Sequence, residues 1–351
     1  MKQEIICKPA DLGFRMPGEW EPHRGTWLSW PRREGISFPG RYDSIPPVFA
    51  AVVGHLVDGE SVFINVWNED EQRTARDCLR GINLEPVQFH QFPSYEPWCR
   101  DHGPIFIVRD DQGCRECAVV DWDYNAWGNK YVPNDLDDKI PRHIAELRGM
   151  NRFEPGLVLE GGSIEVNGKG TLLTTESCLL NENRNPNHSR EEIECALHDF
   201  LGITQVLWLH QGIAGDDTDG HIDDLARFVD PQTIVAVREQ DPADENYAVL
   251  QDNWERLQSF QDGEGRPFRL VDLPMPKPIW FEGQRLPASY ANFYIANRVV
   301  LLPFFGQPSD AVARDRLQSL FPDRRVIGVD STALIWGLGS FHCLTQQEPA
   351  G

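Results

Sequence analysis

The amino-acid sequence predicts an α/β protein built from many short elements. Short apolar runs alternate with polar, amphipathic stretches along the whole 351-residue chain, and no low-complexity block or Gly/Ser linker divides them. The 29 glycines and 26 prolines predict frequent turns, which favours short strands and helices over long ones. The hydrophobic fraction of 40% and the charged fraction of 25% are typical of a folded protein with a large core. Periodicity alone does not distinguish a doubly wound sheet from a propeller.

Short runs that are rich in β-branched and aromatic residues predict the strands. They lie at 61–67, 103–108, 118–122, 170–174, 205–209, 233–237 and 299–303. A further hairpin is predicted within 163–175, where an apolar run follows a pair of glycines.

The clearest predicted helix covers 190–201. Ser189 and Glu192 have the spacing of a capping box, and Gly202 follows the last turn as a stop signal. An apolar stripe runs along the helix through Ile193, Leu197, Phe200 and Leu201. Similar patterns predict helices near 71–80, 243–260 and 310–320, the last with Ser309 as its candidate N-cap.

The charge balance limits the partners of the protein. With 33 Lys and Arg against 54 Asp and Glu, the formal net charge is −21. A nucleic-acid binder needs a basic surface to displace phosphate counterions, so nucleic acid is excluded as a partner, and an anionic membrane surface is disfavoured. The same balance suits a small cationic ligand.

The sequence predicts a reduced, cytoplasmic protein. No apolar stretch approaches the roughly 20 residues that a membrane helix needs, and the N-terminal segment lacks an apolar signal core. The eight cysteines are too sparse for a disulfide scaffold, and the single pair Cys114 and Cys117 is weak evidence for a metal. The acidic segment 215–226 does not fit a calcium loop, because Gly215 and Ala226 occupy ligand positions. We therefore expect no metal site.

Five polar segments place reactive or charged side chains beside glycine or at the edge of an apolar run. They are 98–104, 159–162, 181–186, 215–224 and 337–343. Cys343 is the candidate nucleophile and His221 its candidate partner, because a thiolate needs a cationic or hydrogen-bonding environment. Each residue also has an ordinary structural reading: Cys343 as a buried apolar residue, Asp101 as an ion-pair partner of Arg100, and Glu160 as the end of a strand. One cleft that holds the cysteine, the histidine and three carboxylates would fit a guanidinium, which matches carboxylates in a bidentate manner.

Six segments, in this order along the chain, resemble the agmatine deiminases, also called agmatine iminohydrolases, of the bacterial peptidylarginine-deiminase-like group of guanidino-modifying enzymes. They are GFRMPGEWEPHRGTWLSWP at 13–31, WCRDHGP at 98–104, LEGGSIEVNGKGTLLTTESCLLNENRNP at 159–186, GDDTDGHIDDLARF at 215–228, ASYANFYIAN at 288–297 and HCLTQQEP at 342–349. The resemblance implies one catalytic domain over 1–351 with the pentein fold, an α/β propeller of five pseudo-symmetric ββαβ repeats around a central channel. It also implies hydrolysis of agmatine to N-carbamoylputrescine and ammonia without a metal or organic cofactor.

The resemblance assigns a role to each matching residue. Cys343 corresponds to the nucleophile that forms a covalent thiouronium intermediate, and His221 to the general acid and base. The remaining assignments are Asp101 and Asp223 as the carboxylates that grip the guanidinium, Glu160 as the acid that orients the histidine, Trp98 as part of the channel wall, and Asp217 as the acceptor of the distal amine.

Two segments depart from the family pattern. The turn 337–342 reads GLGSFH where the family has a pattern closer to GGGNIH, and the loop 32–42, which can approach the far end of the substrate, also differs. These departures leave the deimination chemistry in place but keep other substrates open, namely peptidyl or free arginine. An amidinotransferase and a non-catalytic guanidine- or polyamine-binding protein are further alternatives. Family members are often dimers, so a homodimer is an expectation that the sequence itself does not test.

Overall fold

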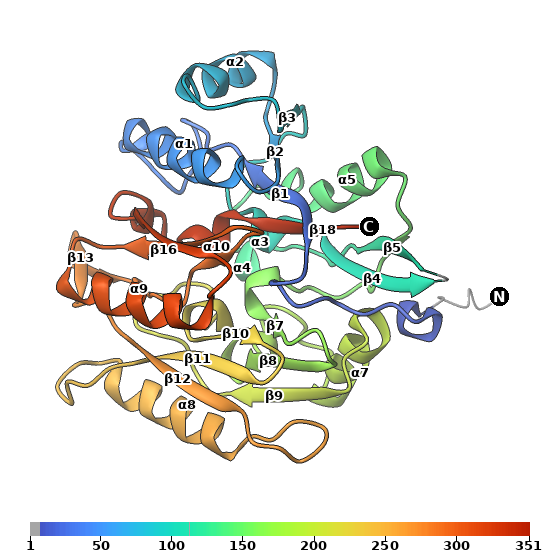
Figure 1. Ribbon diagram of the computed structural model, residues 1–351, viewed down its shortest axis with the longest axis vertical. Coiled ribbons are helices and arrows are strands. Elements are labelled where there is room, and N and C mark those ends of the chain that lie inside the picture. The colour runs from blue at the N-terminus through green and yellow to red at the C-terminus, as the bar shows by residue number, and fades with distance from the viewer. Residues whose placement is uncertain (1–7, 112) are drawn as a thin grey trace.

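The computed structural model describes residues 8–111 and 113–351, and it confirms the α/β class (Figure 1). Within these residues, five sheets share one connectivity: two antiparallel strands, then a helix, then a third strand parallel to the second. Two parallel neighbouring strands need a crossover connection of about a dozen or more residues, and the helix supplies it. The chain is therefore a series of ββαβ units.

Four of the units are continuous in sequence. They are β4 (Ile105–Asp111), β5 (Cys114–Val120), α5 (Ile140–Arg148) and β6 (Arg152–Phe153); β7 (Glu165–Val166), β8 (Thr171–Thr175), α7 (Arg190–Leu201) and β9 (Gln205–Leu209); β10 (Ala226–Asp230), β11 (Thr233–Arg238), α8 (Tyr247–Ser259) and β12 (Arg269–Pro274); and β15 (Tyr294–Ile295), β16 (Val299–Phe304), α9 (Pro308–Leu320) and β17 (Arg325–Asp330).

The fifth sheet joins the two ends of the described chain. Its first strand is the C-terminal β18 (Gln346–Pro349), which pairs antiparallel with β1 (His23–Ser29). Helix α1 (Ile45–Leu56) then leads to the parallel strand β2 (Ser61–Asn65), and α2 (Glu69–Cys78) leads to β3 (Val87–His90). A separate hairpin, β13 (Ile279–Phe281) with β14 (Gln284–Leu286), lies between the third and fourth continuous units.

Most of the sequence predictions of elements are confirmed. Each predicted strand overlaps an observed one, the 163–175 hairpin is present as β7 and β8, and α7 has the predicted capping box with Gly202 in the left-handed region at φ 69°. The N-cap prediction for α9 is wrong: the helix begins at Pro308, and Gln307 caps it together with Asp310. Proline at the first helical position places the cap two residues earlier than predicted, and the hydroxyl of Ser309 lies 2.8 Å from that of Tyr290.

Short helical turns precede the first strands of the sheets and carry the candidate site. These turns are α3 (Cys99–His102) before β4, the 3-10 turns Gly161–Ser163 before β7 and Ile222–Asp224 before β10, and α10 (Phe341–Leu344) before β18. Figure 1 shows α3 and α10 near the middle of the molecule, with the longer helices α1, α7, α8 and α9 toward its outside. Helix α3 contacts both α10 and the turn Gly161–Ser163. The turn Gly161–Ser163 in turn contacts Ile222–Asp224. Residues far apart in sequence therefore meet at one place.

Among the helices that the structure describes, none has the length and apolar character to cross a membrane.

Candidate active site

A cavity of about 330 Å³ opens at these central turns. Cys343, Asp101, Trp98 and Asp217, all predicted from the sequence as site residues, line it. The loop residues Ile36, Ser37 and Pro39 line it as well, so the divergent 32–42 loop does face the site. The volume falls in the range of small-molecule sites.

Cys343 is buried in α10 among polar groups. Its Sγ accepts a hydrogen bond from Asn292 Nδ2 at 3.1 Å and lies 3.6 Å from Asp223 Oδ2. Burial, and then the nearby charges of Asp223, Asp224 and Asp101, raise the pKa of Cys343 well above its ordinary value. The cysteine therefore keeps its proton at neutral pH until a cation offsets these carboxylates.

Asp223 is held by a chain of buried ionic hydrogen bonds. His342 places Nδ1 2.7 Å from Asp223 Oδ2 and Nε2 2.8 Å from Glu19 Oε2. Burial alone would raise the pKa of Asp223, but the hydrogen bond and the charge of His342 outweigh it and lower the pKa. Glu19 in turn pairs with Arg227 at 2.9 Å and Arg100 at 3.2 Å. Asp223 is thus kept ionised beside the thiol.

Asp101 is oriented by two donors. The backbone N–H of Gly162 donates to Oδ1 and Trp127 Nε1 donates to Oδ2, each at 3.0 Å. Burial and the charges of Asp223 and Glu160 raise the pKa of Asp101, to about 6, against the opposing charge of His221. Arg100 forms its ion pair with Glu19, so Asp101 remains available to a ligand.

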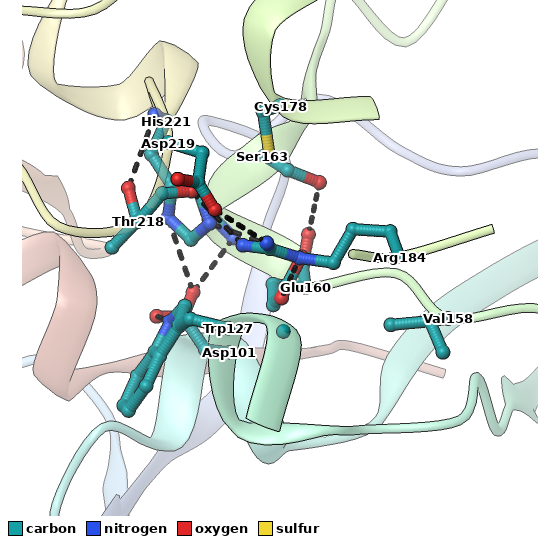
Figure 2. Close-up of polar contacts among 12 residues, drawn as sticks. Asp101, Trp127, Val158, Glu160, Ser163, Cys178, Arg184, Thr218, Asp219 and His221 are labelled. Atoms are coloured by element: carbon teal, nitrogen blue, oxygen red, sulfur yellow. Dashed lines mark hydrogen bonds and ion pairs between the residues drawn. The ribbon is translucent and has the colours of Figure 1, made fainter. Parts of the chain in front are cut away.

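His221 lies between two carboxylates, as Figure 2 shows. Its Nδ1 is 3.7 Å from Asp101 Oδ1, and its Nε2 is 3.9 Å from Glu160 Oε2. Burial would lower the pKa of His221, but Asp101, Cys178 and Glu160 raise it well above the ordinary value. Glu160 receives a hydrogen bond of 2.6 Å from Arg184 Nε on its other oxygen. Three predicted site residues are not among the described residues that line the cavity: His221, Glu160 and Asp223. His221 lies next to Asp101, which does line it.

Aromatic and acidic side chains also line the cavity. Trp98 donates through Nε1 to Ser37 Oγ at 2.8 Å, and Asp217 accepts a hydrogen bond from the hydroxyl of Tyr131. Glu96 also lines the cavity and accepts a hydrogen bond of 2.9 Å from the N–H of Ile36. None of the described lining residues is a lysine or an arginine.

The divergent turn before the nucleophile packs tightly against Trp98. A Cβ at Gly339 would lie 2.5 Å from its ring, and a Cβ at Gly337 2.8 Å. Between these glycines, Leu338 lines the cavity in the left-handed region at φ 68°, a conformation that costs a non-glycine residue about 1–2 kcal/mol. Because Gly337 and Gly339 have no Cβ, the turn that carries Leu338 can lie against the Trp98 ring without displacing it.

Trp127 and Asn292 are among the site residues that the sequence reasoning missed. Trp127 belongs to α4 (Ala126–Asn129), where Ala126, Trp127, Gly128 and Asn129 all have positive φ, so the turn is left-handed. No local pattern apart from Gly128 signals such a turn. Asn292, which contacts Cys343 and Asp224, precedes β15 as the other site residues precede their first strands. Locating the first strand of each ββαβ repeat in the sequence would have pointed to it.

Comparisons with known proteins identify the family. Residues 15–349 match the pattern of the Porphyromonas-type peptidyl-arginine deiminases. A putative agmatine deiminase from Legionella pneumophila is 37% identical, with 97% of this chain and 96% of the relative covered. An agmatine deiminase from Ectopseudomonas mendocina is 38% identical, with 99% and 98% covered.

A solved structure of the agmatine deiminase of Enterococcus faecalis superimposes with a TM-score of 0.91 at 34% identity, covering 99% of each chain. The likeness thus extends over the whole length of both proteins. The chain belongs to the Porphyromonas-type peptidyl-arginine deiminase family, in which it is similar to agmatine deiminases along its full length.

Proposed function

We propose that the protein hydrolyses agmatine to N-carbamoylputrescine and ammonia through a covalent intermediate on Cys343. The observation that carries the proposal is the buried Cys343 thiol among Asp223, Asp224 and Asp101, in a cavity that Asp217 and Glu96 also line. Such a site attracts a linear molecule with a positive charge at each end. Family membership supports the same reaction.

The first step depends on the charge of the substrate. Asp101 and Asp223 receive the guanidinium nitrogens, and the cation offsets the charges that raise the pKa of Cys343. The Cys343 thiol then loses its proton to solvent only when the substrate is bound, with the guanidinium carbon near Sγ. Attack forms the C–S bond and gives a tetrahedral adduct.

Histidine and water complete the reaction. His221 donates a proton to the departing nitrogen, the C–N bond breaks, and ammonia leaves a thiouronium on Cys343. His221, oriented by Glu160, then takes a proton from water, which attacks the same carbon, and the C–S bond breaks to return the thiol and the ureido product. The buried Arg184–Glu160 pair supports this role of Glu160, because it fixes one carboxylate oxygen and leaves the other toward His221.

The lining of the cavity favours agmatine over arginine. The α-carboxylate of free arginine would approach Asp217 and Glu96, and no lysine or arginine among the described lining residues would offset it. The distal ammonium of agmatine meets an acceptor in Asp217 instead. Peptidyl-arginine, which has no free carboxylate at the arginine residue unless that residue is C-terminal, is the second candidate, and the family name favours it.

A colorimetric ureido assay tests the proposal. Agmatine, free arginine and a peptide with an internal arginine are supplied to the wild type and to Cys343→Ala, whose fold is checked by circular dichroism. We expect turnover of agmatine far above the other two and none in the variant. Turnover in Cys343→Ala would exclude the covalent mechanism, and preference for the peptide would reassign the substrate.

We further propose that the five ββαβ sheets form a single five-bladed propeller domain around the cavity. We also propose that the protein acts on a small guanidino substrate in the cytoplasm, as a homodimer. The repeated connectivity of the sheets and the pairing of β18 with β1, which joins the chain ends, support the propeller. A single cooperative unfolding transition, sedimentation equilibrium and cell fractionation test these points in turn.

A further inference from the structure

Three buried side chains of different chemistry meet beside the cavity. Glu160, Cys178 and His221 each offer one ligand atom, and these atoms lie within 4.8 Å of one another. They come from separate segments: Glu160 precedes the turn Gly161–Ser163, Cys178 lies in α6 (Glu176–Leu179), and His221 precedes the turn Ile222–Asp224. In the part of the chain that the structure describes, no other group of three such side chains is this close. Cys178 has no part in the proposed reaction.

The polar atoms that face this group make no hydrogen bonds within the described protein. Nε2 of His221 and Oε2 of Glu160, which lie toward each other, are buried without a hydrogen-bond partner; Nδ1 of His221 lies toward Asp101 instead. The distance of 3.9 Å between Nε2 and Oε2 is too long for a direct hydrogen bond. Buried polar atoms without partners are unfavourable, so the group is suited to a ligand that binds all three side chains.

The surroundings hold each donor in place. Arg184 fixes the other oxygen of Glu160, the hydroxyl of Thr175 accepts a hydrogen bond of 3.2 Å from the N–H of Cys178, and Thr218 accepts one of 3.2 Å from the N–H of His221. Supporting contacts of this kind orient the residues of metal sites. A sulfur, a nitrogen and a carboxylate oxygen suit zinc, whereas magnesium and calcium prefer oxygen ligands alone.

We infer that Glu160, Cys178 and His221 form an inhibitory Zn²⁺ site. Ligand atoms around tetrahedral zinc are about 3.3–3.8 Å apart, so small side-chain rotations bring the three donors into range. The ion displaces the thiol proton of Cys178 and any second proton of His221, both of which go to solvent. The binding itself is independent of the reaction. The inhibition rests on the proposed function, because coordination occupies the imidazole nitrogen that would otherwise carry a proton.

The thiol of Cys343, with Asp223 at 3.6 Å, is the competing zinc ligand, and the first experiment separates the two. Cys343→Ser, which keeps all three proposed donors, is titrated with Co²⁺ as a spectroscopic substitute for zinc and then with Zn²⁺. We expect one equivalent of Co²⁺ with a thiolate-to-metal absorption band, which Zn²⁺ removes. The double variant Cys343→Ser/Cys178→Ser, with folding checked by circular dichroism, is expected to lose the band.

Absence of the band in Cys343→Ser, or its persistence in a folded double variant, would overturn the site. The first of these outcomes decides the question even if the double variant does not fold.

The second experiment measures inhibition in enzymes that retain Cys343. Zn²⁺ is expected to inhibit the wild type reversibly, with activity restored by a chelator. In Cys178→Ser the inhibition constant is expected to rise at least about tenfold, with each enzyme compared with its own metal-free activity. Cys195→Ser, which removes an exposed cysteine of α7, is the matched control and should leave the constant unchanged.

Equal inhibition constants in the wild type and Cys178→Ser would contradict the inhibitory role. A protein without activity on any guanidino substrate would refute the proposed function instead, and the Co²⁺ titration would still test the site.

Discussion

At the scale of single residues, the carboxylates around Cys343 determine the protonation and reactivity of its thiol. Burial and the charge of Asp223 raise the pKa of the thiol, and Asp223 itself is kept ionised by His342. A thiol in this state reacts slowly with neutral alkylating agents, because the thiolate is the nucleophile. The same carboxylate that suppresses the free thiol is needed to bind the cation that activates it.

Asp223→Asn is therefore expected to have opposite effects on two rates. Removing the charge lowers the pKa of Cys343, so alkylation of Cys343 by iodoacetamide at pH 8 should be at least about tenfold faster, while deimination falls by at least about a hundredfold. Mass spectrometry of the Cys343 peptide measures the first rate, and the ureido assay the second. Asp123→Asn, outside the site, is the control. Slower alkylation in Asp223→Asn would contradict the electrostatic account.

Asp217 separates the binding of the far end of the substrate from the chemistry. Asp217→Asn keeps a partner for the Tyr131 hydroxyl but removes the charge that would meet the distal ammonium. We expect KM for agmatine to rise by about 10- to 100-fold, with little effect on an alkylguanidine that lacks the amine. Steady-state kinetics with both substrates provide the measurement. Equal effects on the two substrates would reject this role of Asp217.

His102 makes stability depend on pH. It is buried, its Nε2 lies 3.2 Å from the carbonyl oxygen of Glu96, and burial lowers its pKa to about 4. Between about pH 6.5 and 4 the unfolded chain binds a proton at this residue and the folded protein does not, so stability falls on acidification by up to about 3 kcal/mol. The variant His102→Gln has no titratable group at this position and therefore lacks this loss of stability on acidification. Urea unfolding at pH 7 and 4.5 should show a steeper loss for the wild type, and parallel losses would contradict the assignment.

At the scale of elements, the turns before the first strands leave no room around the reacting groups. A Cβ at Gly162 would lie 2.6 Å from both Asp101 Oδ1 and His221 Nδ1. Gly162 needs no unusual backbone angle, so the constraint is the close approach of these two side chains. The N–H of the same residue holds Asp101.

Gly162→Ala is expected to lower kcat at least about a hundredfold, because displacement of Asp101 and His221 by a fraction of an ångström misplaces both the guanidinium and the proton carrier. Gly54→Ala, on α1 with its nearest neighbour at 3.5 Å, is the control and should retain full activity. Kinetics and thermal unfolding of both variants distinguish a local effect from a loss of the fold. Wild-type kcat in Gly162→Ala would show that the turn tolerates the side chain.

At the scale of the whole molecule, the pairing of β18 with β1 joins the two ends of the described chain. Glu348 in β18 is buried and accepts hydrogen bonds from Trp27 Nε1 of β1 at 2.8 Å and from Arg148 Nη2 of α5 at 2.9 Å. The strand that completes this sheet begins three residues after Cys343. Closure of the sheet and placement of the nucleophile therefore depend on the same short segment.

Glu348→Ala is expected to lower the free energy of unfolding by about 3–5 kcal/mol, because Arg148 would be left buried without a carboxylate partner. Glu116→Ala, which removes a half-buried partner of Arg109, should cost less than about 1 kcal/mol. Equilibrium urea unfolding compares the two variants with the wild type. Similar losses in both would show that the closing strand contributes no more than a surface pair.

The sequence by itself determined what depends on neighbouring residues. The α/β class, the capped helix α7 and the strand runs follow from local patterns, and the motifs around Asp101, Glu160, His221 and Cys343 indicate the family. Local patterns failed at the left-handed turn that carries Trp127 and at the cap of α9, which lies two residues before the predicted one. They also failed for the bond from Asn292 to Cys343, because its two partners are far apart in sequence.

Only the tertiary structure decided which of these segments meet. It brought His342 between Asp223 and Glu19, turned Arg100 away from Asp101, and placed Cys178 beside His221. The physical reason is that these contacts join residues tens to hundreds of positions apart. They form only when separate sheets pack together, and no pattern within a single segment contains that information.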